Sequence, residues 1–291
     1  MVAGFEADAV VSAWGGPQGV EHGEGAFWDD EAQVFRYVDM LAGDLMTIDA
    51  GETHRRHVAD IAALVRRRRE GGFVIATENG FLLLDEAMNA ERAVPVFDDS
   101  SVRMNEGACD AAGRLFCGSM AYDYRPGAGT VYRLDPDLSV HVALEGVTIP
   151  NGLVWDQAGT TAFHADTGDD AVHAYGYDVT TGTFGVRDTF VRFDDQVGSP
   201  DGIALDVEGG LWVAMWGGSA VLRFDPTGAL SDTVPVPVSA VTSCAFGGPD
   251  GWTLLVTTSR LGAPRDRDPR AGETFQVEVG VAGAPVHRFA G

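Results

Sequence analysis

The stretch Asp201-Gly-Ile-Ala-Leu-Asp206 has three relatives elsewhere in the chain, and together they decide the fold. The other copies read Glu24-Gly-Ala-Phe-Trp-Asp29, Asn105-Glu-Gly-Ala-Cys-Asp110 and Asn151-Gly-Leu-Val-Trp-Asp156. Each copy places a polar residue five positions before an Asp, with a Gly one or two positions after the polar residue and then a short, mostly apolar run of β-strand character. A phrase that recurs in this way indicates a repeated structural unit.

Each copy is followed by a turn and a second strand, and then by a third strand that ends in Asp. The closing Asp residues of the last three copies advance by 46 and then 50 residues. The longer gap before Asp110 holds one more unit, read from Gly71-Gly-Phe-Val-Ile-Ala76 and Phe81-Leu-Leu-Leu-Asp85, and a last unit runs through residues 242–246 and 254–257. Six units of about 48 residues, each with three or four short strands, are typical of propeller blades.

We therefore predict an all-β protein. It is expected to be one domain over residues 1–291, a six-bladed β-propeller whose four-stranded antiparallel blades surround a central channel. Long helical patterns are absent, which disfavours a doubly wound or α/β-barrel fold. In such a ring the innermost strands begin at the channel mouth, so equivalent residues of different blades can converge there.

Composition excludes several classes of function. The formal net charge of −23 disfavours nucleic acid and anionic membranes as partners. All 20 basic residues are arginine, so a Schiff-base lysine and a Walker-type phosphate lysine are excluded. The run Arg66-Arg-Arg-Arg69 is expected to be a solvated strand end or turn rather than a binding patch.

The three cysteines, Cys109, Cys117 and Cys244, form neither a disulfide framework nor a paired zinc motif. Cys117 and Cys244 stand in apolar runs and are predicted to be core residues. The sequence shows neither a signal-peptide pattern nor an apolar run of membrane-spanning length. We predict a soluble cytoplasmic protein that is a monomer or a small homo-oligomer.

Glu24, Asn105, Asn151 and Asp201 are predicted to meet at the channel mouth, since they hold the same place in the four copies. Glu24, Asn151 and Asp201 offer only oxygen ligands, and two carboxylates balance one divalent ion. Calcium is the first choice, with magnesium, manganese, iron or zinc as alternatives. Three protein ligands leave positions open for water or substrate, which is typical of a catalytic metal.

Arg103 stands two residues before Asn105, so both side chains can face the channel and hold hydroxyl or carboxylate groups of a ligand. Asp123 lies on a loop after the following strand and can reach the same mouth. An ordinary solvated loop residue is an equally good interpretation of Asp123.

The chain resembles the gluconolactonase/senescence-marker-protein (regucalcin) family of six-bladed propellers. The matching segments are spread over nearly the whole chain: Glu21-His-Gly-Glu-Gly-Ala-Phe-Trp-Asp29, Arg103-Met-Asn-Glu-Gly-Ala-Cys-Asp-Ala-Ala-Gly-Arg-Leu-Phe-Cys-Gly-Ser-Met-Ala121, Ile149-Pro-Asn-Gly-Leu-Val-Trp155, Pro200-Asp-Gly-Ile-Ala-Leu-Asp206 and Thr242-Ser-Cys-Ala-Phe-Gly-Gly-Pro-Asp250.

The resemblance implies metal ligands at Glu24, Asn151 and Asp201, and substrate contacts at Arg103, Asn105 and Asp123. It also implies hydrolysis of a sugar lactone with a divalent metal, with Asp201 as both ligand and base. Two features depart from the family: Asn105-Glu-Gly107 replaces its usual Asn-Asp-Gly, and the loop over residues 121–129 differs. Both border the expected mouth, so they bear on the choice of substrate.

The sequence thus predicts a metal-dependent lactonase that acts on an aldonolactone. Two alternatives remain open. The first is an aryl-ester or organophosphate hydrolase on the same scaffold, because one fold hosts many chemistries. The second is a non-catalytic propeller that binds a metal or a metabolite.

Overall fold

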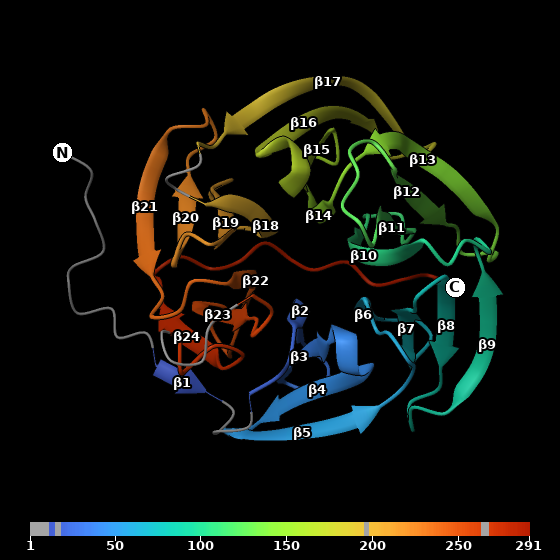
Figure 1. Ribbon diagram of the computed structural model, residues 1–291, viewed down its shortest axis with the longest axis horizontal. Coiled ribbons are helices and arrows are strands. Elements are labelled where there is room, and N and C mark those ends of the chain that lie inside the picture. Colours follow the sequence, from blue (N-terminus) through green and yellow to red (C-terminus); the bar gives the residue numbers. More distant parts are fainter. Residues whose placement is uncertain (1–11, 15–18, 195–197, 263–267) are drawn as a thin grey trace.

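A computed structural model describes residues 12–14, 19–194, 198–262 and 268–291. Six antiparallel sheets of four strands each are arranged as blades around a central channel (Figure 1). The predicted six-bladed β-propeller is therefore confirmed. Among the described residues, no helix is long and apolar enough to span a bilayer.

The blades follow one another along the chain, and each starts with the strand nearest the channel. Blade 1 contains β2 (Gly23–Asp29), β3 (Val34–Asp39), β4 (Asp44–Asp49) and β5 (Glu52–His57), and blade 2 contains β6 (Leu64–Arg67), β7 (Phe73–Ala76), β8 (Gly80–Leu84) and β9 (Ala90–Pro95). Blade 3 contains β10 (Val102–Cys109), β11 (Leu115–Ala121), β12 (Gly129–Leu134) and β13 (Val140–Val147), and blade 4 contains β14 (Pro150–Trp155), β15 (Thr161–Asp166), β16 (Ala171–Asp178) and β17 (Thr183–Arg192). Blade 5 contains β18 (Ser199–Leu205), β19 (Leu211–Trp216), β20 (Ala220–Phe224) and β21 (Leu230–Pro235), and blade 6 contains β22 (Val241–Gly247), β23 (Thr253–Thr258), β24 (Thr274–Glu278) and β1 (Ser12–Trp14). Two short 3-10 helices, η1 (Met40–Ala42) and η2 (Thr167–Asp169), connect strands within blades 1 and 4.

Burial falls from the channel outward, and composition follows it. The inner strands β22 and β23 are buried along their whole length, whereas the outer strands β5 and β9 are mostly exposed and rich in charged residues. The apolar inner strands pack face to face between neighbouring blades, and this packing forms the core.

A β-bulge recurs in the innermost strand of five blades. Register shifts fall between Glu24 and Phe27 in β2 and between Met104 and Gly107 in β10, and equivalent shifts occur in β14, β18 and β22. In four of these strands the shift contains the polar–Gly phrase of the sequence repeat. A bulge re-aims side chains locally, and here the polar residues of the repeat reach the channel.

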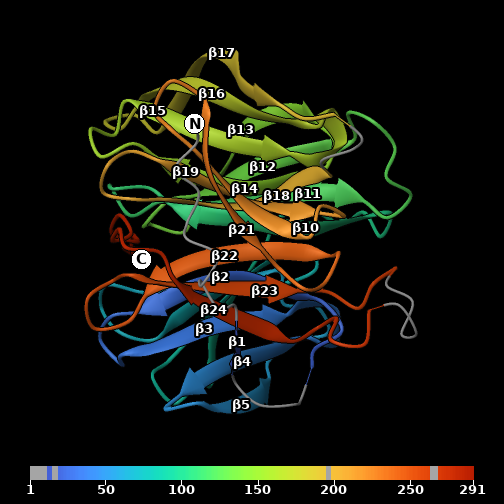
Figure 2. The same ribbon diagram turned by 90° about the vertical axis from the view of Figure 1, so that its left-hand side faces the viewer.

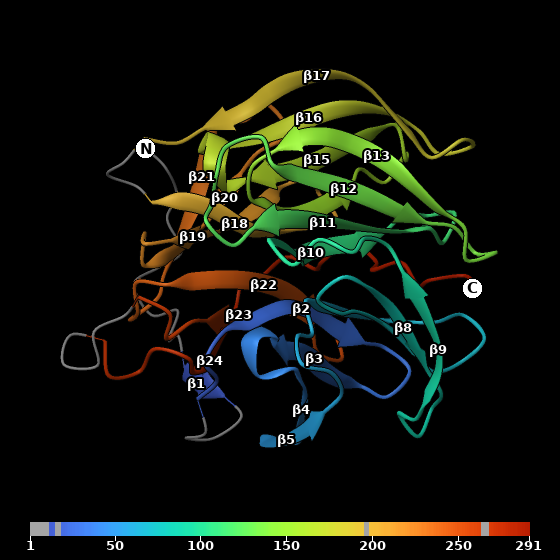
Figure 3. The same cartoon turned by 45° about the vertical axis from the view of Figure 1, so that its right-hand side comes forward.

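Both ends of the chain contribute to closing the ring. Strand β1 pairs with β24 and supplies the outer strand of blade 6, as Figure 2 shows from that side. The segment after β24 then crosses one end of the channel and ends beside blade 2 (Figures 1 and 3). Backbone hydrogen bonds hold this segment to blade 5 at Leu205, to blade 2 at Arg67 and to blade 3 at Gly113. We call residues 279–291 the C-terminal crossing segment.

The prediction for the arginine run is wrong for its first two members. Arg66 and Arg67 belong to β6, and each is only 6% exposed. Arg67 forms ion pairs with Asp29, Glu31 and Glu86, whereas Arg66 points to the channel and binds backbone carbonyls. Several partners of these buried charges come from neighbouring blades, and the run itself gives no sign of them. The prediction that Cys117 and Cys244 are core residues is confirmed.

Candidate functional site

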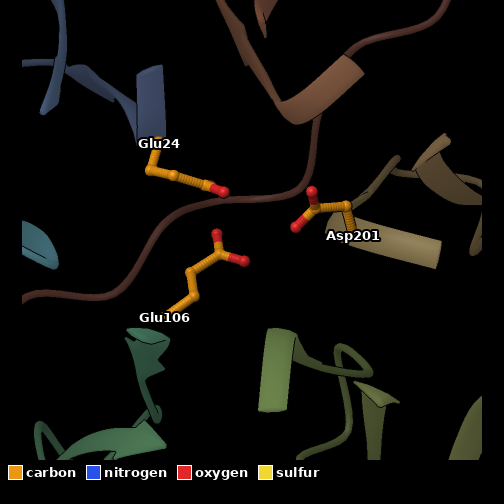
Figure 4. A group of neighbouring side chains, drawn as sticks. All are labelled: Glu24, Glu106 and Asp201. Atoms are coloured by element: carbon orange, nitrogen blue, oxygen red, sulfur yellow. The ribbon is translucent and has the colours of Figure 1, made fainter. Parts of the chain in front are cut away.

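Three carboxylates from three blades meet in the channel. Glu24 in β2, Glu106 in β10 and Asp201 in β18 each place a carboxylate oxygen within 4.8 Å of the other two (Figure 4). All three side chains are buried. The structure therefore brings together the predicted Glu24 and Asp201, and it adds Glu106, which the sequence analysis had connected only with the choice of substrate.

The bulge in β10 explains how Glu106 joins the cluster. Successive residues of a regular strand face opposite sides of the sheet, so Asn105 and Glu106 would not share the channel. The register shift between Met104 and Gly107 breaks this alternation, and both side chains are buried at the channel. The signal was present in the sequence, because this copy alone has its Gly displaced by one position, which leaves two polar residues in front of it.

The electrostatics of the cluster favour a bound cation. Burial, and then the nearby carboxylates, raise the pKa of Glu24 well above its usual value, and the same two causes raise the pKa of Asp201. Burial raises the pKa of Glu106 to about 7, against the lowering effect of Arg66. Glu24 Oε2, Glu106 Oε2 and Asp201 Oδ1 have no hydrogen-bond partner within the described part of the chain. Unpaired buried oxygens with like charge fit a hard divalent ion, which would satisfy them all.

A chain of hydrogen bonds links the amide residues beside this cluster. Arg103 Nη1 donates to Asn105 Oδ1 (2.7 Å), and Asn105 Nδ2 donates to Asn151 Oδ1 (2.8 Å). Asn151 Nδ2 donates in turn to Thr167 Oγ1 (2.6 Å), which donates to the Pro200 carbonyl (2.7 Å). The chain fixes the Asn151 amide oxygen toward the channel, and one of its lone pairs is left for a ligand.

A cavity of about 380 Å³ opens above the carboxylates. Its polar lining comprises His22, Glu24, Arg103, Asn105, Asn151, Thr167 and Asp201, and its apolar lining comprises Met120, Tyr124, Ile149, Trp216 and Leu261. Five of the six predicted site residues therefore share one cavity. Asp123 does not line it: its side chain is 63% exposed and pairs with Arg125 (3.1 Å), and the neighbouring Tyr124 takes the place at the rim.

His22 is a second lining residue that the sequence reasoning missed. It stands two positions before Glu24 and so shares its face, as Arg103 does with Asn105. Its Nδ1 lies 2.8 Å from Ser259 Oγ, and its Nε2 lies 3.6 Å from Glu24 Oε1. Burial, and then the charge of Arg103, lower the pKa of His22 to about 3, so the imidazole is neutral at physiological pH.

The raised pKa values predict that divalent metal binding strengthens with pH. A carboxyl must lose its proton before it binds a cation, so protons compete with the metal. Since the pKa of Glu106 is about 7, affinity should rise at least about tenfold between pH 6 and pH 8. Calorimetric titration of metal-free protein with calcium or manganese at the two pH values measures this change. An affinity that stays flat or falls would contradict it, and a folded circular-dichroism spectrum at both values is the control.

The fold and the site define a class of protein: a six-bladed β-propeller with an acidic, oxygen-donor site inside its channel. The description "SMP-30/Gluconolactonase/LRE-like region" matches residues 22–260. The chain belongs to this family, as its sequence motifs had indicated.

Relatives and solved structures agree with this assignment. Regucalcin of Gallus gallus is 36% identical over 283 residues, covering 92% of this chain and 95% of the relative. The protein named "Putative sugar lactone lactonase YvrE" of Bacillus subtilis (strain 168) is 32% identical over 279 residues, with 92% and 95% covered. The crystal structure of regucalcin from Agrobacterium tumefaciens str. C58, described as a calcium-binding protein, superposes with a TM-score of 0.90 at 25% identity, over 96% of this chain and 97% of that one.

Proposed function

We propose that this protein is a divalent-metal-dependent lactonase that hydrolyses a sugar lactone to the aldonic acid. The observation that carries the proposal is the cluster of three carboxylates, each with one oxygen that has no hydrogen-bond partner among the described residues, beside a cavity that also presents Arg103 and two amides. Sugar lactone hydrolysis is an activity that the family includes by name, and the similarity to a sugar lactone lactonase supports it.

Glu24, Asn151 and Asp201 are the proposed metal ligands, and Glu106 lies close enough to be a fourth. Calcium is the first candidate because every donor is oxygen, and a regucalcin of similar structure is described as calcium-binding. Magnesium, manganese, iron and zinc remain alternatives. When bound, such an ion polarises the lactone carbonyl and offsets the charge that develops on its oxygen.

Asp201 is the proposed general base. Burial, and then the charge of Glu106, raise the pKa of its carboxyl, and Oδ1 has no hydrogen-bond partner among the described residues, so this side chain is placed to accept a proton from the attacking water. Arg103 and Asn105 face the same cavity and are proposed to bind the sugar hydroxyls. Asp123, next to Tyr124 at the rim, is proposed as a further contact for a long substrate.

The test is hydrolysis of a panel of aldono-γ- and δ-lactones, followed with a pH indicator. Chelator-stripped protein receives calcium, magnesium, manganese, iron(II) or zinc one at a time. Turnover that depends on added metal would support the proposal and rank both substrate and ion. Folded protein that binds a metal but hydrolyses none of the lactones would overturn it.

Apolar residues that line the cavity also fit the alternative of an ester hydrolase. Tyr124, Trp216 and Leu261 are among the residues that line the cavity, and they suit a substrate with an aromatic or alkyl group. Aryl acetates and a phosphotriester therefore belong in the same panel. Faster turnover of these compounds than of any sugar lactone would favour the alternative. Metal binding without turnover on the whole panel would favour the binding module.

Arg103→Met is expected to weaken substrate binding more than it slows the chemical step. A hydrogen bond to a charged group contributes about 1.5–3 kcal/mol, so KM should rise by roughly 10- to 100-fold, with a smaller change in kcat. Steady-state kinetics on the best lactone measures the split. Arg56→Met, on the exposed outer strand β5 and away from the cavity, is the control. An unchanged KM for Arg103→Met would remove Arg103 from the substrate site.

A further inference from the structure

Blade 2 differs from the other blades at the channel. Its innermost strand, β6, has neither the polar–Gly phrase nor a register shift. By strand register, Arg66 is equivalent to Ala108 of β10 and Ala204 of β18, and all three residues line the channel beyond the position of the phrase. Together with Glu106, Arg66 lines a small cavity of about 90 Å³ beneath the carboxylates.

The guanidinium of Arg66 joins the two neighbouring blades. Its Nη1 donates to the Gly25 carbonyl of blade 1 (3.0 Å) and to the carbonyl of the adjacent Val65 (2.7 Å), and its Nη2 donates to the Gly107 carbonyl of blade 3 (2.9 Å). These glycines directly follow Glu24 and Glu106, inside the two bulges that aim those carboxylates. One planar fork therefore holds the backbone on which two of the three acidic side chains stand.

A buried arginine is a costly way to hold two carbonyls. Removing a charged group from water costs several kcal/mol, and a packed apolar side chain is often the more stable choice. This desolvation cost is offset where the buried charge also stabilises nearby groups of opposite charge. Here three carboxylates lie within 4.8 Å of one another, and Glu106 lines the same small cavity as Arg66. The fixed positive charge of Arg66 lies beside Glu106 and favours the ionised form of that carboxyl next to the other two.

We propose that Arg66 is a positioning residue of the metal centre. It fixes the bulges that carry Glu24 and Glu106, and its charge allows three carboxylates to approach one ion. The inference rests on the proposed function only in that a divalent ion binds the cluster. Lysine cannot replace it, because a single ammonium lacks the rigid fork that spans two carbonyls.

The experiment measures calcium and manganese binding to the chelator-stripped full chain by calorimetry. Arg66→Lys keeps the charge and removes the fork, and Arg66→Met removes both. Arg67→Met is the matched control, since Arg67 is the next residue of β6, is equally buried, and pairs with Asp29, Glu31 and Glu86 on the other side of the strand. Thermal unfolding of each variant is followed by circular dichroism.

Both Arg66 variants are expected to bind metal about 10- to 100-fold more weakly, which is the usual effect of losing a partner that orients a metal ligand. Arg67→Met should lose thermal stability and keep its metal affinity. If Arg66→Met does not fold, Arg66→Lys decides the result, because it retains the charge and most of the side-chain volume.

Two results would overturn the inference alone: unchanged affinity in both Arg66 variants, or tighter binding by Arg66→Met, which would mean that Arg66 acts only by repelling the ion. A wild-type protein that binds no divalent ion would instead overturn the metal dependence of the proposed function, and this inference with it. The wild-type titration thus separates the two failures.

Discussion

Replacing Asp201 with Asn is expected to lower lactone turnover by about 10²–10⁴-fold, the usual contribution of a general base. The substitution keeps the shape of the side chain and removes both the proton acceptor and one of three clustered carboxylates. Metal binding should weaken as well. The kcat value must therefore be measured at metal concentrations that saturate the variant, as established by titration.

Asp225→Asn is a suitable control, because Asp225 caps a turn of the same blade outside the cavity through its hydrogen bonds to Thr227. It should keep wild-type turnover. Near-wild-type turnover by Asp201→Asn with metal bound would rule out the proposed mechanism and leave Asp201 as a ligand at most.

Gly107→Ala is expected to lower stability strongly. A Cβ at this position would lie 1.8 Å from the Phe116 carbonyl oxygen and 2.7 Å from Cys117 Cα. Both atoms belong to the backbone of β11, which is paired on its other side with β12 and cannot retreat. We expect a loss of about 4 kcal/mol or more in the free energy of unfolding. Because Gly107 also forms the bulge, any folded fraction should bind metal poorly.

Urea unfolding followed by circular dichroism measures the change. Gly176→Ala provides the matched control, since a Cβ there meets no atom within 4 Å and its φ angle is not in the left-handed region. It should remain within about 0.5 kcal/mol of wild type. Equal stability of the two variants would show that β10 and β11 separate more easily than their register suggests.

The fold was predictable because the repeated phrase marks the same strand in each blade. Glu24, Asn105, Asn151 and Asp201 stand at one offset within their copies, and all four lie on innermost strands. The spacing of the closing Asp residues located blade 2, whose own copy is missing, and the strand pattern over residues 242–246 and 254–257 added blade 6. The alternation of apolar and polar residues in strands and the residue types of turns are local properties, so they can be read directly from the sequence.

The site residues that the sequence analysis missed depend on three-dimensional contacts, and the spacing of residues along the chain does not reveal such contacts. Glu106 reaches the cluster through a bulge, and one displaced Gly is the only trace of it in the sequence. Arg66 stands in a run of four arginines, and such runs are usually solvated. The carbonyls that bind it lie 41 residues away in each direction along the chain. His22 was passed over because its neighbour Glu24 belongs to the repeat and it does not.

The C-terminal crossing segment affects how substrate and product enter and leave the channel. It spans the channel beneath the carboxylates, where its residues 284–287 line the small cavity with Arg66 and Glu106. With this segment across the far end, we expect a compound that enters above Asp201 to leave by the same opening. The aldonic acid formed beside the carboxylates would pass Arg103 as it leaves the cavity. There it would compete with the next lactone molecule for binding to Arg103. We therefore expect release of the product, rather than cleavage of the ester bond, to limit the turnover rate.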